Sequence, residues 1–429
     1  ANALAERRPR SGGSRRGRGA CRGESTRLGL KVIVAGAGIA GLTAAWELTR
    51  SGNDVAILES ERRLGGVIVT EQVDGFVVEG GPDGFLASEP ELPALAQELG
   101  IGHRVIDQVE HGTSLWSGDK FEPLPAGRAA ALLGIDATAT EVAAGFRSFA
   151  RGMAEPVATM AQRLAGSLRL AQGVAGITRN GKRWRLAITG GSAHDADAIV
   201  LAVPAYTAGR LLESVGIRGA REVAEVVYAT STTVSLAYRT EQIGAPLEGA
   251  GFVVDPNVPA EQTRPPIQLR ACTFASQKFP GRAPAGHTLL RAYLGATGDH
   301  PSRLAHEQLA AMPGIRGEPL WSRTFHWNRG LPRYRPHHAE RIAGIRHRLE
   351  RLPPLALAGA GYDGAGVSAC VRSRRPPHRP AGCLADISRD SYDAIDGKTE
   401  LLIHALVGRR RSESLQSNNH AGISHPAVP

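Results

Sequence analysis

The stretch Lys31-Val-Ile-Val-Ala-Gly36-Ala37-Gly38-Ile39-Ala40-Gly41-Leu42 decides the fold. A short apolar run leads into a G-x-G-x-x-G pattern, and small residues at helical spacing follow. A second apolar run, Asp54–Leu58, ends at the acid Glu59. In such a strand–turn–helix–strand–acid arrangement the first glycine allows a tight turn, the second admits a pyrophosphate, and the third lets the helix pack closely on the sheet. The stretch therefore predicts a dinucleotide site with phosphates at the helix N-terminus and Glu59 on a ribose.

The residues after Glu59 indicate which dinucleotide is bound. The chain continues Ser60-Glu-Arg62-Arg63-Leu-Gly65-Gly66-Val67, which combines an arginine-bearing turn with a pair of glycines. Flavoproteins use this combination to run the phosphates and flavin of FAD along a backbone, and a nicotinamide enzyme does not need it. The expected cofactor is therefore FAD. Arg62 and Arg63 could reach a phosphate, and a solvated charge pair is an equally good interpretation.

Four separated blocks carry a resemblance to one family. The first is Leu64-Gly-Gly-Val-Ile-Val-Thr-Glu-Gln-Val-Asp-Gly-Phe-Val-Val-Glu79-Gly80-Gly81-Pro82-Asp83-Gly84-Phe85-Leu86-Ala87, and the others are Ala271–His287, Trp327–Tyr334 and Leu357–Val367. In this order they resemble the porphyrinogen oxidases of haem synthesis, which are FAD enzymes of the amine-oxidase superfamily. The resemblance covers roughly residues 31–374.

This resemblance implies a fold and a reaction. The implied fold class is α/β, with a Rossmann-like FAD-binding domain beside an α+β substrate domain built on an antiparallel sheet. In the implied reaction, hydride passes from a porphyrinogen to the flavin, and molecular oxygen takes the electrons to give hydrogen peroxide. Because the cofactor carries the difficult step, no catalytic triad is needed, and we name no catalytic base. Protoporphyrinogen and coproporphyrinogen both stay open as substrates.

The expected FAD contacts come from the fingerprint, from the turn after Glu59, and from two later segments that the resemblance assigns. The expected set is Gly36, Ala37, Gly38, Ile39, Ala40, Gly41, Glu59, Ser60, Arg62, Gly65, Gly66, Val67, Gly80, Gly81, Pro82, Asp83, Val174, Gly359, Tyr362, Gly364, Ala365, Gly366 and Val367. Val174 is included because the resemblance places a valine there against the adenine. Ordinary turns are the alternative for the later glycines. For Tyr362 the alternatives are ring packing beside the flavin and a core hydroxyl.

Five other polar residues are candidates for a role in the reaction, three of them as possible substrate contacts. Lys278, Arg282 and His287 could meet substrate carboxylates. The preferred interpretation is that they are surface charges on a loop. His337 and His338 are expected to cap or pack rather than to catalyse.

Apolar periodicity and the resemblance together predict seven segments. They are a disordered basic arm (1–30), a first stretch of the FAD-binding domain (31–127), a shortened linker (128–145), a second stretch of the FAD-binding domain (146–215), a substrate-domain sheet (216–335), a third stretch of the FAD-binding domain (336–374) and a disordered tail (375–429). Helices are expected over 91–100, 153–164, 206–212 and 339–352, and from Val367 onward; strands over 173–178, 183–188, 198–203, 232–238, 267–273, 288–294, 320–327 and 355–358; and a loop over 120–127.

The chain departs from the resembled family at two places. Relatives carry a long helical region of the substrate cavity where this chain has only Arg128–Gly145, so we expect the helical subdomain to be largely missing. After Ser373 the chain reads Arg374-Arg-Pro-Pro-His-Arg-Pro380, and prolines inside a helix remove donors and clash with the preceding turn. The closing helix should therefore be short. Both departures predict impaired porphyrinogen turnover, with FAD binding retained.

Composition narrows the classes of partner and cellular location that remain possible. The formal charge of +10 lies at the ends, because residues 1–31 carry nine Lys and Arg against two acids and residues 371–429 carry nine against six. The neutral body argues against a nucleic-acid partner, although contact of the basic arm with nucleic acid or anionic lipid is an alternative. The four cysteines lack disulfide or zinc spacing, and no apolar run spans a bilayer. We expect a cytoplasmic protein, with peripheral membrane contact left open.

Two other functions stay open. An amine oxidase or a carotenoid desaturase would share the FAD blocks. A non-catalytic FAD-binding protein on the same scaffold is favoured by the short segment at 128–145. The oligomeric state is not predicted.

Overall fold

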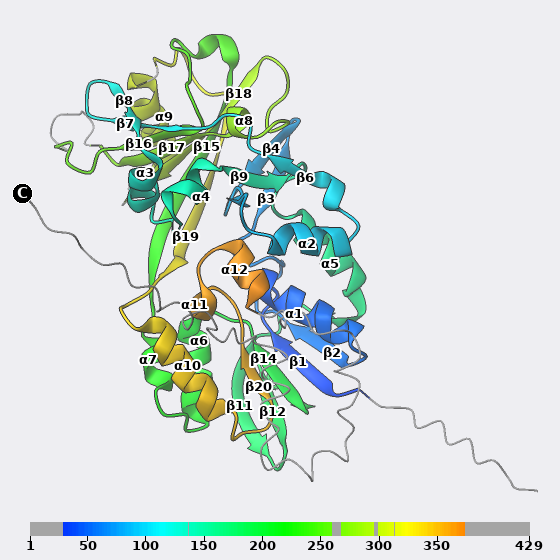
Figure 1. Cartoon of the computed structure of the whole chain (residues 1–429). Coiled ribbons are helices and arrows are strands. Elements are labelled where there is room, and N and C mark those ends of the chain that lie inside the picture. The colour runs from blue at the N-terminus through cyan, green and yellow to red at the C-terminus, as the bar shows by residue number, and fades with distance from the viewer. Residues whose placement is uncertain (1–28, 136, 260–266, 296–298, 313, 374–429) are drawn as a thin grey trace, which may run out of the picture.

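A computed structural model describes residues 29–373, except 136, 260–266, 296–298 and 313. The predicted tail (375–429) and all but Gly29 and Leu30 of the predicted arm lie outside the described residues. Figure 1 shows a parallel sheet in the lower half of the molecule and a larger, mainly antiparallel sheet in the upper half. Short strands and helices join the two.

The fingerprint strand lies at the centre of a five-stranded sheet. The strand order is β10 (Leu168–Arg169), β2 (Asp54–Leu58), β1 (Lys31–Ala35), β14 (Ala198–Leu201) and β20 (Leu355–Leu357). Every pair of neighbours in this sheet is parallel. Parallel strands buried on both faces are apolar rather than alternating, which is the pattern of β14 and of β1 after its first residue, Lys31.

Each face of this sheet carries its own core. Val32 and Val34 pack with α1 (Ile39–Arg50), α2 (Glu91–Glu98) and α5 (Glu155–Arg163). Ile33 and Ala35 point to the opposite face, as successive residues of a strand must. The elements on that face are β11 (Val174–Asn180), β12 (Arg183–Ile188), β13 (Ala193–Ala196), α6 (Ala205–Ser214) and α10 (His338–Leu349).

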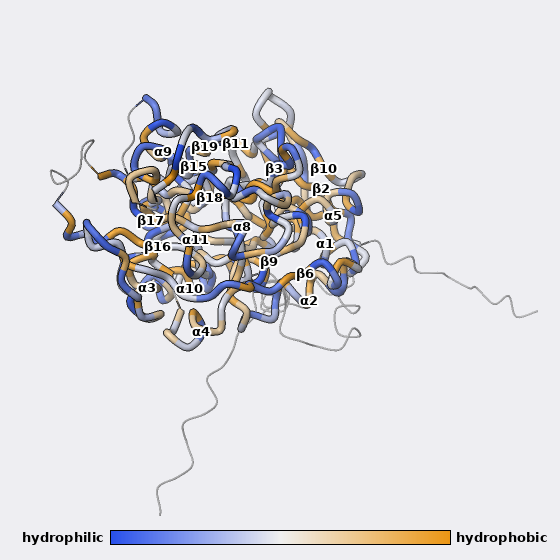
Figure 2. The backbone as a smooth tube through the Cα atoms, turned by 90° about the horizontal axis from the view of Figure 1, so that it is seen from above, coloured by the Kyte–Doolittle hydropathy of each residue, from blue (hydrophilic) through white to orange (hydrophobic). Residues whose placement is uncertain are grey.

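The second sheet has seven strands. Their order is β19 (Trp321–Arg333), β15 (Val227–Arg239), β18 (His287–Leu294), β17 (Leu269–Phe274), β16 (Gly251–Val254), β7 (Thr113–Trp116) and β8 (Phe121–Leu124). All neighbours are antiparallel except β16 and β7. The predicted α/β fold class, with a second and mainly antiparallel sheet, is confirmed. Figure 2 shows apolar segments concentrated in the interior of the molecule.

The segment before Phe146 differs from the sequence prediction. Residues 120–127 were expected to form a loop, but β8 forms there and α3 (Ala126–Leu133) starts at its end. Pro123 is compatible with a strand because β8 is the edge of the sheet, where a missing N–H is tolerated. β7 and β8 also lie in the seven-stranded sheet, although the sequence predicts that 31–127 belongs to the FAD-binding domain. The interval 128–145 holds the rest of α3 and the short α4 (Ala139–Ala143).

The remaining elements connect the two sheets or cap their edges. They are β3 (Thr70–Val73), β4 (Phe76–Glu79), β5 (Phe85–Leu86), β6 (Val105–Asp107), β9 (Phe146–Phe149), α7 (Ala220–Ala224), α8 (Ala275–Lys278), α9 (Pro301–Ala311), α11 (Ala360–Asp363), α12 (Val367–Arg372) and the 3₁₀ turns Gly102–Arg104, Ala165–Ser167 and Thr240–Gln242. The predicted start of the closing helix at Val367 is confirmed. Within residues 29–373, the described helices include none long and apolar enough to cross a membrane.

Close packing of α1 on the sheet generates a first testable prediction. A Cβ atom at Gly41 would lie 1.9 Å from the Gly36 carbonyl oxygen, and neither backbone can move without disturbing the turn. Gly41→Ala should therefore lower the free energy of unfolding by ~3 kcal/mol or more, measured by urea denaturation of the flavin-free protein. Gly166→Ala is the matched control, because a Cβ there meets nothing within 4 Å. Equal stability of the two variants would contradict the packing described.

Candidate functional site

The glycine turn after β1 leaves one side of the helix N-terminus open. Gly36 has φ +101°, and a Cβ there would lie 2.4 Å from the Ala202 carbonyl oxygen. Gly38 is the N-cap of α1 in an extended conformation, and a Cβ there would meet nothing within 4 Å. The backbone at Gly38 can therefore be approached by a ligand, and the first N–H groups of α1 favour an anion there.

Glu59 is fixed beside this turn by donors from its own chain. One carboxylate oxygen accepts from the Ala37 N–H at 2.7 Å, and the other accepts from the Glu61 N–H at 2.9 Å and the Ser60 hydroxyl at 3.2 Å. A carboxylate offers about four acceptor positions. These three donors therefore leave one acceptor position of Glu59 for a donor from a ligand.

The corner after β2 is completed by the segment that contains Val174. The Glu59 N–H donates to the Arg169 carbonyl at 2.9 Å, and the Gln172 N–H donates to the Glu59 carbonyl at 2.7 Å. A Cβ at Gly173 would lie 3.2 Å from Cβ of Ser60. Val174 is half-buried next to this corner. The structure thus brings the expected ribose and adenine residues together.

The glycine pair after the arginines lies against the fingerprint. The Gly65 N–H donates to the Ala37 carbonyl at 2.9 Å, and a Cβ at Gly66 would lie 3.5 Å from Cα of Gly38. Arg63 donates to the Gly66 carbonyl at 2.6 Å and lies 5.6 Å from the Trp327 ring centre. Arg62 and Val67 are exposed. Arg63 therefore braces the glycine pair, a role that the sequence did not suggest.

The late glycines meet the start of α1 from the other side. Gly359 has φ +115°, and a Cβ there would lie 3.4 Å from Cβ of Ala40. Gly364 has φ +123°, and Gly366 is the extended N-cap of α12. Ala365 and Gly366 are exposed, and Val367 is half-buried. This segment therefore lies next to the fingerprint in space, although more than 300 residues separate the two in sequence.

Tyr362 uses its hydroxyl in the core. The side chain is buried, and its hydroxyl donates to the Val203 carbonyl at 2.8 Å. Burial raises the pKa of Tyr362 well above its ordinary value, so the group stays a neutral donor. Of the two alternatives for this residue, the core hydroxyl agrees with the structure.

The Gly80–Asp83 segment is held by donors from the seven-stranded sheet. The carbonyl oxygens of Gly80 and Gly81 both accept a hydrogen bond from Nη2 of Arg291. The distance from Nη2 to the Gly80 oxygen is 3.3 Å. The Gly80 carbonyl also accepts from Nε1 of Trp327 at 2.8 Å. Arg291 is buried in the middle of β18, between Leu290 and Ala292. The sequence signal was an arginine inside an apolar strand, which needs a buried partner.

Lys278 and Arg282 are not surface charges, which corrects the preferred sequence interpretation. Lys278 Nζ lies 3.0 Å from Oδ2 of Asp83, and it is 8% exposed. Arg282 Nη2 lies 3.4 Å from Oε1 of Glu79 and donates to the Ser148 hydroxyl at 2.6 Å. Lys278 is the last residue of α8, and Arg282 lies in the loop that follows, whose carbonyl at Arg282 accepts from the Val77 N–H of β4 at 3.1 Å. Both cations are thereby placed against acids of the Glu79–Asp83 segment.

His338 packs, as expected. His287 begins β18 and is half-buried, which corrects the preferred interpretation of this residue as a surface charge on a loop. The His287 ring lies 5.7 Å from that of Phe76. His338 stacks on Tyr334 at 4.6 Å, and His337 is exposed.

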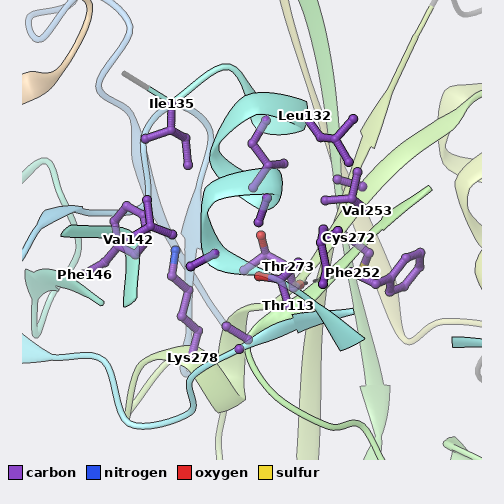
Figure 3. Close-up of a pocket in the computed structure, with 18 of the residues that line it drawn as sticks. Thr113, Leu132, Ile135, Val142, Phe146, Phe252, Val253, Cys272, Thr273 and Lys278 are labelled. Atoms are coloured by element: carbon purple, nitrogen blue, oxygen red, sulfur yellow. Dashed lines mark hydrogen bonds between the residues drawn. The ribbon is translucent and has the colours of Figure 1, made fainter. Parts of the chain in front are cut away.

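Asp83 is the point at which this network meets a cavity. Burial raises the pKa of Asp83, but Lys278 and Arg291 outweigh it, and the pKa lies below its ordinary value. The carboxylate is therefore ionised at neutral pH. Asp83 also lines a cavity of about 540 Å³ between α3, α4 and strands β7, β16, β17 and β18. Figure 3 shows Lys278 rising into this cavity, with Leu132 and Ile135 across from it.

Several known proteins are similar to this chain over most of its length. Coproporphyrinogen III oxidase of Bacillus subtilis (strain 168) is 23% identical over 79% of this chain and 95% of the relative. The enzyme of the same name from Mycobacterium leprae (strain TN) is 28% identical, over 79% of this chain and 95% of the relative. A protein from Exiguobacterium sp. 255-15, provisionally named a protoporphyrinogen oxidase, has a crystal structure that matches with a TM-score of 0.68 at 23% identity, over 80% of this chain and 97% of that one.

The family itself follows from a match over most of the chain. Residues 39–151 and 121–373 fit the flavin-containing amine oxidoreductase family. This range holds the glycine pair and Gly359, which lie against the fingerprint, and the Gly80–Asp83 segment, whose Asp83 lines the cavity. The chain belongs to the flavin-containing amine oxidoreductase family, and it is a flavin-dependent oxidoreductase.

Proposed function

We propose that this chain binds FAD and oxidises a porphyrinogen to a porphyrin, with molecular oxygen as the electron acceptor. The observation that carries the proposal is the position of Asp83. It ends the segment expected to line the flavin, and it is also a wall of the cavity. Cofactor and substrate would therefore meet at this turn. The names of the curated relatives support the substrate class and favour coproporphyrinogen.

The residues around the fingerprint fit FAD. Gly38 is open to a pyrophosphate, and Glu59 retains an acceptor for a ribose hydroxyl. Gly65, Gly66 and Gly359 lie where the rest of the cofactor would run. When bound, FAD supplies the acceptor for the substrate's hydride and the centre at which oxygen is reduced.

The chain's own contribution to the reaction is binding, orientation and exclusion of water. Arg291 and Trp327 hold the Gly80–Gly81 carbonyls, which fixes the backbone against which the flavin would lie. Apolar side chains such as Leu132, Val142 and Phe252 line the cavity, and a bound substrate would displace water from them. Low polarity strengthens the electrostatic contacts that orient a bound substrate.

A non-catalytic flavoprotein is the second candidate, and one observation favours it. The alignment with the Bacillus relative runs over 458 positions, more than the 429 residues of this chain, so the relative contains residues that this chain lacks. We place these missing residues in the interval 128–145, which contains only the end of α3 and the short α4. A smaller cavity would bind substrate less well, and we expect turnover to be slow rather than absent.

Gly38→Ala tests the cofactor site. A methyl group there meets no protein atom, so the flavin-free protein should unfold at the same temperature as the parent protein. It would project toward the phosphates, and flavin affinity should fall at least about tenfold. Flavin absorbance after gel filtration and thermal unfolding measure the two effects. Gly166→Ala, equally unhindered but far from the turn in sequence, should change neither. Full flavin content in Gly38→Ala would place the pyrophosphate elsewhere.

Turnover tests the reaction. Flavin-loaded protein mixed with coproporphyrinogen or protoporphyrinogen in air should produce porphyrin fluorescence and hydrogen peroxide, faster with coproporphyrinogen. Anaerobic mixing should bleach the flavin once and then stop, because the acceptor is missing. Bound flavin that neither substrate bleaches would identify the non-catalytic alternative.

A further inference from the structure

The cavity beside Asp83 has the size and lining of a small-molecule site. Its volume of about 540 Å³ falls within the range of roughly 300–1,000 Å³ typical of such sites. One wall is formed by Leu132, Ile135 and Val142 from the α3–α4 segment, and the opposite wall by the seven-stranded sheet. A ligand there would be mostly in contact with apolar groups.

The charged groups that line the cavity are predominantly cationic. Lys278 lies within it and Arg270 is an exposed lining residue, whereas Asp83 is the acid. The two other acidic groups stay neutral, because burial raises the pKa of the Cys272 thiol and of the Tyr293 phenol. His111 is the remaining titratable residue of the lining. The cavity therefore suits an apolar molecule that carries negative charge.

Lys278 has donor capacity beyond its ion pair. An ammonium group has three N–H donors, and one hydrogen bond joins it to Asp83 at 3.0 Å. Its other neighbours include the rings of Phe146 and Phe279, 4.6 and 5.1 Å from Nζ. Aromatic faces attract a cation but do not replace a charged acceptor. A carboxylate entering the cavity would gain a charge-assisted hydrogen bond in an apolar environment.

Asp83 would keep other positive charges beside it if Lys278 also bound a ligand. Arg291 and Arg282 also lower its pKa, so positive charge stays beside it when Lys278 turns toward a ligand. Separating a buried ion pair that has no other charged neighbours would cost more free energy.

We propose that the cavity binds an amphipathic carboxylate and that Lys278 is the specificity residue that recognises the carboxylate. This deepens the proposed function, on which it rests for the identity of the ligand: the carboxylate would be a propionate of the porphyrinogen. A merely structural lysine would hold the Gly80–Asp83 segment and leave ligand charge without effect.

The test measures binding without turnover. Flavin-loaded protein is titrated with coproporphyrin III and with its tetramethyl ester, which keeps the ring and removes the negative charges, in the same low detergent. The acid should bind at least about tenfold more tightly than the ester. Lys278→Met should reduce acid affinity to that of the ester and leave ester affinity unchanged. Lys120→Met, an exposed lysine outside the cavity lining, is the matched control.

A double variant separates recognition from structural support. Lys278→Met with Asp83→Asn removes both members of the ion pair, and the melting temperature of each variant reports on folding. If Lys278 recognises the ligand, the double variant keeps the low acid affinity of the single variant. Restored acid affinity in the double variant, or equal loss of acid and ester affinity in Lys278→Met, would overturn the proposal.

A second pair of probes distinguishes this inference from the proposed function. Lys278-dependent binding of dodecanoate over dodecanol, without coproporphyrin binding, would support the carboxylate site and reject the porphyrinogen as its ligand. Porphyrinogen turnover that does not change with Lys278→Met would retain the function and reject this inference. Failure of both carboxylates to bind would also reject the inference.

Discussion

The buried guanidinium of Arg291 is the interaction on which the arrangement of the two sheets around the candidate site depends. It stands in an apolar strand of the seven-stranded sheet, and it donates to carbonyls of the segment that follows β4. A buried charge is tolerated only with partners, and loss of one partner costs ~3–5 kcal/mol. Arg282 and Lys278 add two further cations to the same five-residue segment. The Glu79–Asp83 segment is therefore bound more firmly to the neighbouring sheet than its own short strand pairing would require.

The features of the site that were predictable from sequence are those that backbone geometry determines. Positive φ at Gly36 and the close approach of Gly41 leave little choice of residue, so the glycines identify the turn from the sequence alone. The strands β1 and β14 were predictable as apolar runs, because they are buried on both faces of the sheet. The start of the closing helix at Val367 was likewise readable, because a glycine precedes it.

The features that were not predictable depend on partners distant in sequence. Arg291 and Gly81 are 210 residues apart, and Tyr362 and Val203 are 159 apart. Composition alone therefore made Lys278 and Arg282 look like surface charges, whereas acids from another region of the chain bury and neutralise them. The prediction of a loop over residues 120–127 was wrong for a related reason. Prolines indicate a loop unless the strand lies at an edge, and the position of β8 at an edge is a property of the whole sheet.

The α3–α4 segment is attached to the body of the protein at two anchored ends. Leu124 pairs with Thr113 before it, and Phe146 pairs with Leu86 after it, while the glycine turn and its acid belong to other stretches of the chain. Lengthening or shortening a connection between fixed ends changes closure entropy only slowly. A change in the length or sequence of the α3–α4 segment would therefore alter one wall of the cavity and leave the glycine turn and Glu59 in place.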